Sequence, residues 1–320
     1  MNFKAILSGR LEFGNSRSCE KAMQLFQNRY EIIYKGDVFL KVEDVFNIEN
    51  GGLELFRYST QVGEKTWNNT VNLLEEAAQF AITGKLDAWL TDNGQVLHAR
   101  SIEPKTEKAA IQAFIQGRSL IAHSGREYDA IQSLSQAIEK YERHAAAYER
   151  RGYVNYRLGN LQDALHDYSK SIHINPGAAE AYLGRAVVQV ALDNRETALG
   201  DLEKAIQFSV PLQPVYWIAR RVKGDCHLHM EQYEAAVTEY QFFLKRQFRD
   251  DDVNFRCRRR TAFRLGKALL FQRKNKEATL ALETALKIEG EDPMATDAEI
   301  HDWLQESLKR NTSRPIAVVA

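Results

Sequence analysis

Small residues recur beyond about residue 110 at a nearly constant spacing. Successive members of one alanine series are 34, 34, 38 and 42 residues apart. A second series of small residues precedes it and keeps the same intervals to within one residue. Such a register indicates one repeated structural unit, because small residues are needed wherever two backbones pack closely. The two series are Gly117, Gly152, Ala186, Gly224 and Gly266, then Ala130, Ala164, Ala198, Ala236 and Ala278.

Residues 145–178 contain one complete unit. Tyr148 precedes Gly152 by about one helical turn, and a second helical stretch follows Gly159. Pro176 ends that stretch, because proline cannot continue a helix. Apolar residues recur at helical spacing in both halves. The unit is therefore predicted to be two amphipathic helices folded back on each other.

The unit resembles the tetratricopeptide repeat. The resemblance lies in a bulky residue one turn before a small one, an alanine followed four positions later by an aromatic residue, and a closing proline. It implies a mainly α fold, a right-handed α-solenoid of about five helical hairpins with a capping helix. A disordered tail is expected at 311–320. The predicted helical domain spans 105–310, with hairpins near 110–144, 145–178, 179–212, 213–250 and 251–292 and a capping helix at 296–310.

The fourth and fifth repeats are longer than the others. Four extra residues, 213–216, precede the small residue of repeat four, and eight precede that of repeat five. Pro214 suits the first position of a helix, and the acidic stretch 250–252 suits a helix N-terminus. We predict that both first helices are lengthened at their N-terminal ends. Flexible loops of the same length are the alternative.

Residues 1–104 carry a different pattern. Residues 3–13 alternate between apolar and polar side chains, as in a half-buried strand, and 53–58 resemble a second strand. Apolar residues recur at helical spacing over 19–33 and 67–81. The sequence therefore predicts a small α+β domain with a mainly antiparallel sheet. Its family is not recognised.

A β-hairpin is predicted near the end of this domain. Residues 86–91 and 96–101 flank the dipeptide Asn93–Gly94, which favours a two-residue turn with positive φ at both positions. Pairing outward from that turn places Leu90 opposite Leu97 on one face of the sheet.

Composition excludes several classes of protein. Lys and Arg number 43 and so do Asp and Glu, so the net charge favours neither nucleic acid nor an anionic membrane as the partner. No sustained apolar run begins the chain, so no signal peptide or membrane span is expected. Cys19, Cys226 and Cys257 are widely spaced, which fits a reducing, cytoplasmic location.

Enzyme signatures are missing from the sequence. No Gly-rich phosphate loop, HExxH or nucleophile-elbow serine is present. Cys226 and His229 share a helix face, but a closed zinc site needs four ligands. His166, Asp167 and Ser169 lie on one helix and point in different directions, which argues against a catalytic triad. We therefore expect no catalytic residues, no metal and no cofactor.

The first helix of each hairpin lines a concave groove in the tetratricopeptide-repeat family. Carried onto this chain residue by residue, that rule gives apolar side chains in repeat three and cations in the repeats on either side. Such a groove suits a partner peptide with acidic and apolar residues. The alternative is that these side chains pack on neighbouring helices or face water. The candidate groove residues are Arg118, Glu149, Tyr153, Tyr156, Arg157, Val187, Arg221, Arg260, Arg264 and Lys267.

Charge is unevenly spread near the C-terminus. Residues 245–274 have a net charge of +8, and residues 276–306 have a net charge of −7. The basic face at 256–267 is either an anion site or the internal partner of the acidic region at 277–306. RNA binding through this face is disfavoured, because the segment lacks aromatic residues placed for base stacking.

These patterns together predict a non-catalytic adaptor or scaffold that binds a partner protein in the groove. One alternative is that the N-terminal domain is an enzyme or a ligand-sensing module that the repeats direct to a target. The other is polyanion or RNA binding through 256–267. No membrane partner is expected, and homo-oligomerisation is left open.

Overall fold

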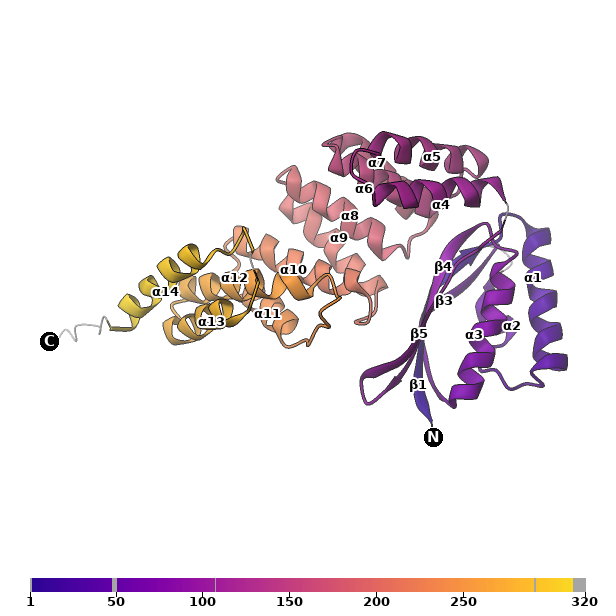
Figure 1. The fold of residues 1–320 in the computed structure, drawn as a ribbon, viewed down its shortest axis with the longest axis horizontal. Helices are drawn as coiled ribbons and strands as arrows, with labels where there is room; N and C mark the ends of the chain where they lie inside the picture. Colours follow the sequence, from indigo (N-terminus) through magenta and orange to yellow (C-terminus); the bar gives the residue numbers. More distant parts are fainter. Residues whose placement is uncertain (1, 48–50, 107, 291, 313–320) are drawn as a thin grey trace. The chain divides into compact units, whose positions relative to one another are not determined.

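The computed structural model describes residues 2–47, 51–106, 108–290 and 292–312 (Figure 1). The chain divides into two compact units, Met1–Val188 and Gln189–Ala320. None of the helices in the described ranges is long and apolar enough to cross a lipid bilayer. The predicted disordered tail lies outside the described residues, except that its first two residues belong to the last helix.

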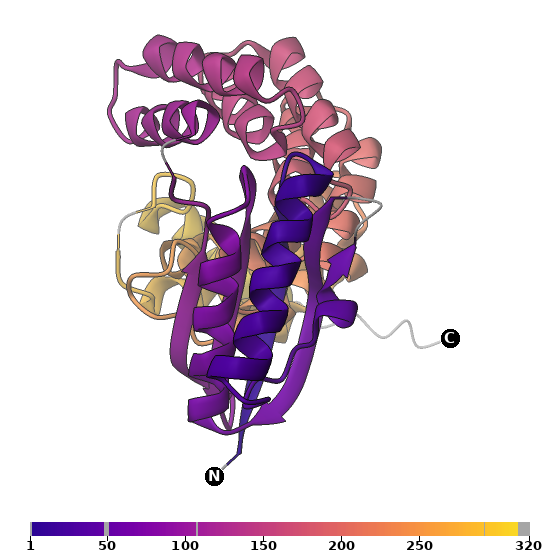
Figure 2. The ribbon, with the colours of Figure 1, turned by 90° about the vertical axis from the view of Figure 1, so that its right-hand side faces the viewer.

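A five-stranded sheet opens the first unit. All its pairings are antiparallel, in the order β2-β3-β1-β4-β5, which confirms the predicted sheet. Helices α1 and α3 cover one face of it (Figure 2). The strands are β1 (Phe3–Glu12), β2 (Phe46–Asn47), β3 (Gly52–Val62), β4 (Thr83–Asp92) and β5 (Gln95–Ile102), and the helices are α1 (Ser16–Asn28), the π-helical turn η1 (Arg29–Ile33), α2 (Val42–Val45) and α3 (Glu64–Ala78).

The core of this domain follows the predicted periodicity. Ala5, Leu7 and Leu11 alternate along β1 and are fully buried. Trp67 and Leu74 of α3 pack in the same core. The alternate apolar residues of the strand and the apolar stripe of the helix therefore pack together in one layer between the sheet and the helices.

The predicted hairpin turn is confirmed, but its register is wrong by one residue. The Asn93–Gly94 turn has φ of 46° and 84°, as the dipeptide favours. Leu90 pairs with His98 instead of Leu97, because the register shifts immediately after the turn. A β-bulge of this kind adds one residue to one strand, and the alternation of side chains does not reveal it.

The helix predicted over 19–33 ends differently from the expectation. Cys19 and Phe26 are buried as expected, but Ile33 is 54% exposed. The amide of Tyr34 donates to the carbonyl of Arg29 at 2.9 Å, which closes a π-helical turn. The prediction that Ile33 faces the core is therefore wrong.

Helical hairpins make up the rest of the described chain, as predicted. The alanine of the second series is fully buried in all five repeats, which explains its regular spacing. α8 spans the boundary between the two units. The helices are α4 (Ala109–Ile121), α5 (Glu127–Lys140), α6 (Ala145–Arg157), α7 (Leu161–Ile174), α8 (Ala179–Ala191), α9 (Arg195–Phe208), α10 (Pro214–His229), α11 (Tyr233–Leu244), the 3₁₀ turn η2 (Phe255–Cys257), α12 (Arg258–Phe271), α13 (Asn275–Lys287) and α14 (Asp297–Thr312).

The glycine of the fourth repeat lets two helices approach closely, and its substitution is a test of the packing. A Cβ at Gly224 would lie 2.7 Å from the ring of Tyr240, which is fully buried. We expect Gly224→Ala to destabilise the protein by about 1–3 kcal/mol through overpacking. Gly200→Ala is the matched control, because nothing lies within 4 Å of its added carbon and alanine favours a helix. Urea unfolding should show a lower free energy of unfolding for Gly224→Ala and a higher one for Gly200→Ala. Equal changes in the two variants would contradict the close packing at Gly224.

Only one of the two long repeats has the predicted lengthened helix. α10 begins at Pro214 and has 16 residues, against 13 in α6. α12 begins only at Arg258, so the prediction for the fifth repeat is wrong. Its extra residues form a turn in which Asp252 accepts from the amide and side chain of Asn254. The fully buried Asn254 also donates to the carbonyl of Pro214, which ties the insertion to α10.

The sheet domain contacts the first hairpins within the first unit. At the ends of β1 and β4, Glu12 accepts from the hydroxyl of Tyr141 at 3.3 Å, and Thr83 lies 3.0 Å from Nδ1 of His144. The ammonium of Lys108 also donates to two carbonyls after α3. Burial raises the pKa of Glu12, and the burial of Tyr141 near this carboxyl raises its pKa to about 12. The connection at 103–106 is thus short and supported by polar contacts on both sides.

Candidate functional site

The candidate cations of the first two repeats have partners within the molecule. Arg118 donates to Glu103 at 2.7 Å, and its guanidinium lies over the ring of Phe114. Arg157 donates to Glu127 at 3.1 Å and to a backbone carbonyl of α4. These two side chains therefore brace neighbouring helices, and an incoming acidic residue would have to compete with their carboxylates.

Glu149 is the most strongly perturbed of the candidate groove residues. Its side chain is 13% exposed and lies 3.0 Å from Nε of Arg150. Burial raises its pKa to about 7, Arg150 opposes this rise, and Glu180 adds to it. Tyr153, also on α6, is 38% exposed. The remaining two candidates of the first unit, Tyr156 and Val187, are half-buried.

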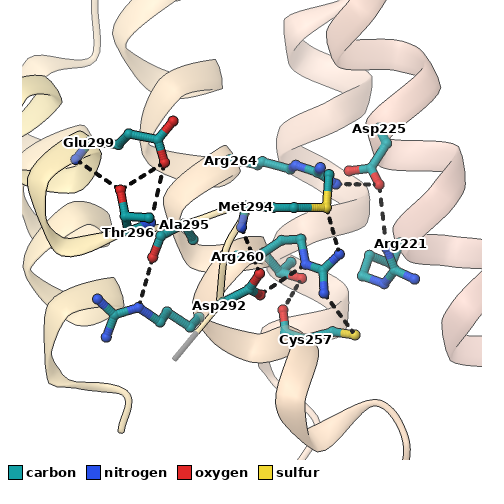
Figure 3. A network of polar contacts seen from close by, with 12 residues as sticks. Arg221, Asp225, Cys257, Arg260, Arg264, Asp292, Met294, Ala295, Thr296 and Glu299 are labelled. Atoms are coloured by element: carbon teal, nitrogen blue, oxygen red, sulfur yellow. Dashed lines mark hydrogen bonds and ion pairs between the residues drawn. The ribbon is translucent and has the colours of Figure 1, made fainter. Parts of the chain in front are cut away.

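The second unit brings several candidate residues around one carboxylate (Figure 3). Asp225 of α10 forms ion pairs with Arg264 of α12 at 2.5 Å and with Arg221 at 3.4 Å. Its other oxygen accepts from the hydroxyl of Tyr240 at 2.8 Å. All three charged side chains are less than a fifth exposed. We call Arg221, Asp225, His229, Arg264 and Lys267 the α10–α12 surface.

Lys267 lies beside Arg264 and two aromatic rings. Its ammonium is 4.7 Å from the ring centre of Trp303 and 5.4 Å from that of Phe263. Burial and the charge of Arg264 lower its pKa. The pKa of His229 is likewise lowered, by burial and by the nearby cations. The more distant carboxylate of Glu299 partly opposes the lowering of the Lys267 pKa, but no carboxylate in the described ranges lies at ion-pair distance from Lys267. Arg221, Arg264 and Lys267 together therefore carry more positive charge than Asp225 neutralises.

Aromatic side chains border this surface. Phe271 stacks on Tyr233 with ring centres 4.8 Å apart, meets Trp303 edge-on and is 45% exposed. The sequence identifies Trp303 only as part of the apolar stripe of a capping helix. Its place next to Lys267 depends on the connection between α13 and α14, which no local pattern predicts.

The densest basic segment is used mainly for internal contacts. Arg259 donates to two backbone carbonyls and pairs with Asp297 of α14, and Arg260 pairs with Asp292 at 3.0 Å. Arg258 lies over the ring of Phe255. Of the two explanations for the basic segment, internal pairing accounts for Arg259 and Arg260.

Other residues with catalytic or metal-binding chemistry are also engaged elsewhere. Cys226 is buried, and burial raises its pKa to about 11. Asp167 accepts two hydrogen bonds from Arg151 and one from Asn155, while His166 is exposed on another side of the helix. No group of three or more possible metal ligands is found in the part of the chain that the structure describes.

Comparisons with known proteins identify the helical region. Residues 124–179 match the family model for the tetratricopeptide repeat. Among solved structures, the chain is similar to Pseudomonas aeruginosa pilF at 18% identity, covering 64% of this chain and 93% of that chain with a TM-score of 0.50. It is also similar to YrrB, described as a TPR protein with an unusual peptide-binding site (16% identity, 61% and 93% coverage, TM-score 0.48), and to MamA (18%, 57% and 93%, 0.47). No curated protein sequence matches the chain.

The family match agrees with the repeat register and with the packing of small residues between paired helices. It falls on the repeats, so the sheet domain remains unrecognised. Residues 124–179 therefore match the tetratricopeptide repeat, and the hairpins on either side of them share its helical fold.

Proposed function

We propose that this protein is a non-catalytic adaptor that holds a segment of a partner protein on the first helices of its repeats. In the second unit, the α10–α12 surface binds an acidic side chain of that segment. The observation that carries this proposal is the position of Lys267, a partly buried ammonium next to Arg264 that has no carboxylate at ion-pair distance among the described residues.

An acidic residue of the partner would neutralise the excess positive charge of this surface. Arg221 and Arg264 share Asp225, so a second carboxylate near Arg264 and Lys267 would form charge-assisted hydrogen bonds without displacing the first. One such bond is worth about 1.5–3 kcal/mol when it is shielded from water. The lowered pKa of Lys267 fits this view, since a bound anion would raise it again.

Apolar side chains of the same segment have a surface next to the cations. Phe271 is nearly half exposed, and Tyr233 and Trp303 flank it. Clusters of aromatic residues are the usual anchors of protein interfaces. The chemistry therefore favours a segment in which an acidic residue neighbours an aromatic or aliphatic one.

The same geometry disfavours a nucleic acid as the partner. Phosphate backbones are bound by rows of free cations and single-stranded bases by exposed aromatic rings. Here Arg258 and Arg259 are occupied by contacts within the second unit, so the basic segment does not present a continuous row of free cations.

A binding experiment with two synthetic peptides tests the proposal. A short peptide containing Glu and Phe should bind the full-length protein, and the same peptide with Gln for Glu should bind about tenfold more weakly. Lys267→Ala should remove most of that preference, because it deletes the cation that lacks a partner. The measurement is isothermal titration calorimetry at two salt concentrations, since the charge contribution is screened by salt.

Arg256→Ala serves as the matched control. Arg256 is an exposed cation of the same basic segment, outside the α10–α12 surface. It should leave the peptide affinity unchanged. Equal losses for Lys267→Ala and Arg256→Ala would indicate non-specific attraction to the basic segment and would overturn the proposal.

A further inference from the structure

The sheet domain has an apolar groove on the side of its helices. It is an open depression of about 510 Å³ along α1 and η1, next to Phe80, which follows α3. Its apolar lining comes from Leu25, Ile32, Ile33 and Phe80, and its polar lining comes from Lys21, Gln24, Asn28 and Arg29. No carboxylate is among these lining residues. We call these eight residues the α1 groove.

The π-helical turn is the reason that the groove is apolar. After the buried Phe26, a regular α-helix would turn position 33 toward the core. Tyr30, four residues after Phe26, faces the core in either geometry, but the wider turn moves the next inward position from 33 to Tyr34; both tyrosines pack against the core. Ile32 and Ile33 are left 66% and 54% exposed. Two neighbouring exposed isoleucines are unfavourable for an isolated domain, and π-turns often occur at functional sites.

The polar lining of the groove is cationic. Lys21 is exposed and forms no ion pair among the described residues. Arg29 donates to Glu76 at 2.8 Å, and both side chains are more than a third exposed. An occupant with negative charge on one side would therefore complement this rim.

The shape of the groove fits a helix. Lys21, the adjacent pair Gln24 and Leu25, Asn28 and Ile32 lie about one turn apart, so they form one stripe along α1 and η1. At 1.5 Å per residue, that stripe is about 16 Å long, which is about three helical turns. A partner helix laid along it would present apolar residues at the same helical spacing.

We propose that the α1 groove binds an amphipathic helix of a partner protein whose polar flank carries acidic residues. This gives the sheet domain a binding role of its own. The inference does not depend on the α10–α12 surface, because it rests only on residues of the sheet domain.

Two synthetic helical peptides with the same leucine face test this inference on the full-length chain. One carries Glu on the polar flank and the other carries Lys. Fluorescence anisotropy should show that the Glu peptide binds at least about tenfold more tightly than the Lys peptide. The double substitution Ile32→Asp and Ile33→Asp should abolish binding, and Lys21→Glu should reduce or reverse the preference. Equal binding of both peptides, or binding that survives the double substitution, would overturn the proposal.

Controls separate the groove from other exposed surfaces. Val96 on β5 is 42% exposed, and Val96→Asp should leave binding unchanged. All of these titrations use protein that also carries Lys267→Ala, because the α10–α12 surface would itself bind an acidic peptide; failure of this inference is then distinguishable from failure of the proposed adaptor site. The variants at Lys21, Ile32, Ile33 and Val96 replace exposed side chains, so each should match the melting temperature of the protein in which it is made.

Two further measurements test other occupants of the groove. Sedimentation velocity of the protein alone would reveal a dimer, and a dimer dissolved by the double substitution would assign the groove to a second copy of this chain. Cosedimentation with phosphatidylserine vesicles, lost in the same variant, would assign it to a membrane surface. Either result would overturn the partner-helix proposal. Its expected result is a monomer that does not bind the vesicles.

Discussion

Lowering the pH from 7 to 4 is expected to cost this protein about 3 kcal/mol of stability through His144 alone. This side chain is 1% exposed at the contact between the sheet domain and the first hairpins. Burial lowers its pKa from 6.5 to about 4. The unfolded chain takes up a proton at its ordinary pKa, whereas the folded protein resists it. The stabilisation is therefore complete above pH 6.5 and is lost as the pH falls toward 4.

Hydrogen bonding explains why the folded protein keeps this ring neutral. Nδ1 of His144 accepts from the amide of Ala147 at 3.2 Å, and an amide can only donate. Nδ1 therefore carries no proton, and Thr83 donates to it as well. Protonation would place a hydrogen against both donors, in a setting where the rings of Phe114 and Tyr141 exclude water.

His144→Asn is the matched control for this pH effect. Asparagine keeps an acceptor for the helix amide and suits an N-cap position, but it does not titrate. Urea unfolding from pH 7 to pH 4 should show a smaller loss for the variant than for the wild type, with the difference confined to the interval from 6.5 to 4. In both proteins Glu12 acts in the opposite direction. Burial raises its pKa, so the folded protein takes up this proton more readily than the unfolded chain and gains stability from it as the pH falls. Parallel curves for the two proteins would contradict the account of His144.

The repeats were predictable because the sequence requirement for them is local and recurs. Each hairpin needs a buried alanine and a second small residue, which is glycine in four repeats and Ala186 in the third, and five copies make the register visible. Alternation along β1 and the Asn93–Gly94 dipeptide are equally direct signals. The division of the chain at residue 104 stays a prediction, and the structure adds that sheet and first hairpins share one unit.

The sequence pattern did not predict features that are produced by one extra residue in a strand or a helix. The bulge beyond Leu90 and the π-turn at Arg29 each shift the phase of side chains by about one position. The insertion before α12 also gave a misleading signal. Its aspartates suit a helix N-terminus, but Asp252 instead caps a turn that buries Asn254.

The sequence could predict which positions form the candidate site, but not which carboxylates pair with the cations there. The family rule selects residues on the first helices, and the structure brings Arg221 and Arg264 together at Asp225, with Lys267 beside Arg264. It also gives Arg118 and Arg157 carboxylate partners from other segments. A one-dimensional pattern cannot distinguish a cation with a partner from one without, because the partners are far apart in sequence.

Replacing Asp225 separates the binding role of the α10–α12 surface from its structural role. Asp225→Asn keeps an acceptor for Tyr240 but turns an amide toward Arg221 and Arg264. Since these side chains are partly exposed, we expect the variant to lose about 2 kcal/mol of stability, below the cost at a fully buried ion pair. The remaining cations would then have no carboxylate of their own. An acidic peptide should therefore bind the variant about tenfold more tightly, a gain of about 1.4 kcal/mol.

The most direct test of the adaptor account is therefore the affinity of the Glu and Phe peptide for wild-type protein and for Asp225→Asn, measured by calorimetry at low salt on samples shown to be folded. The account predicts tighter binding by a less stable protein, and a gain that disappears at high salt. Unchanged or weaker binding by the folded variant would show that the charge excess of this surface does not bind a partner, and would contradict the account.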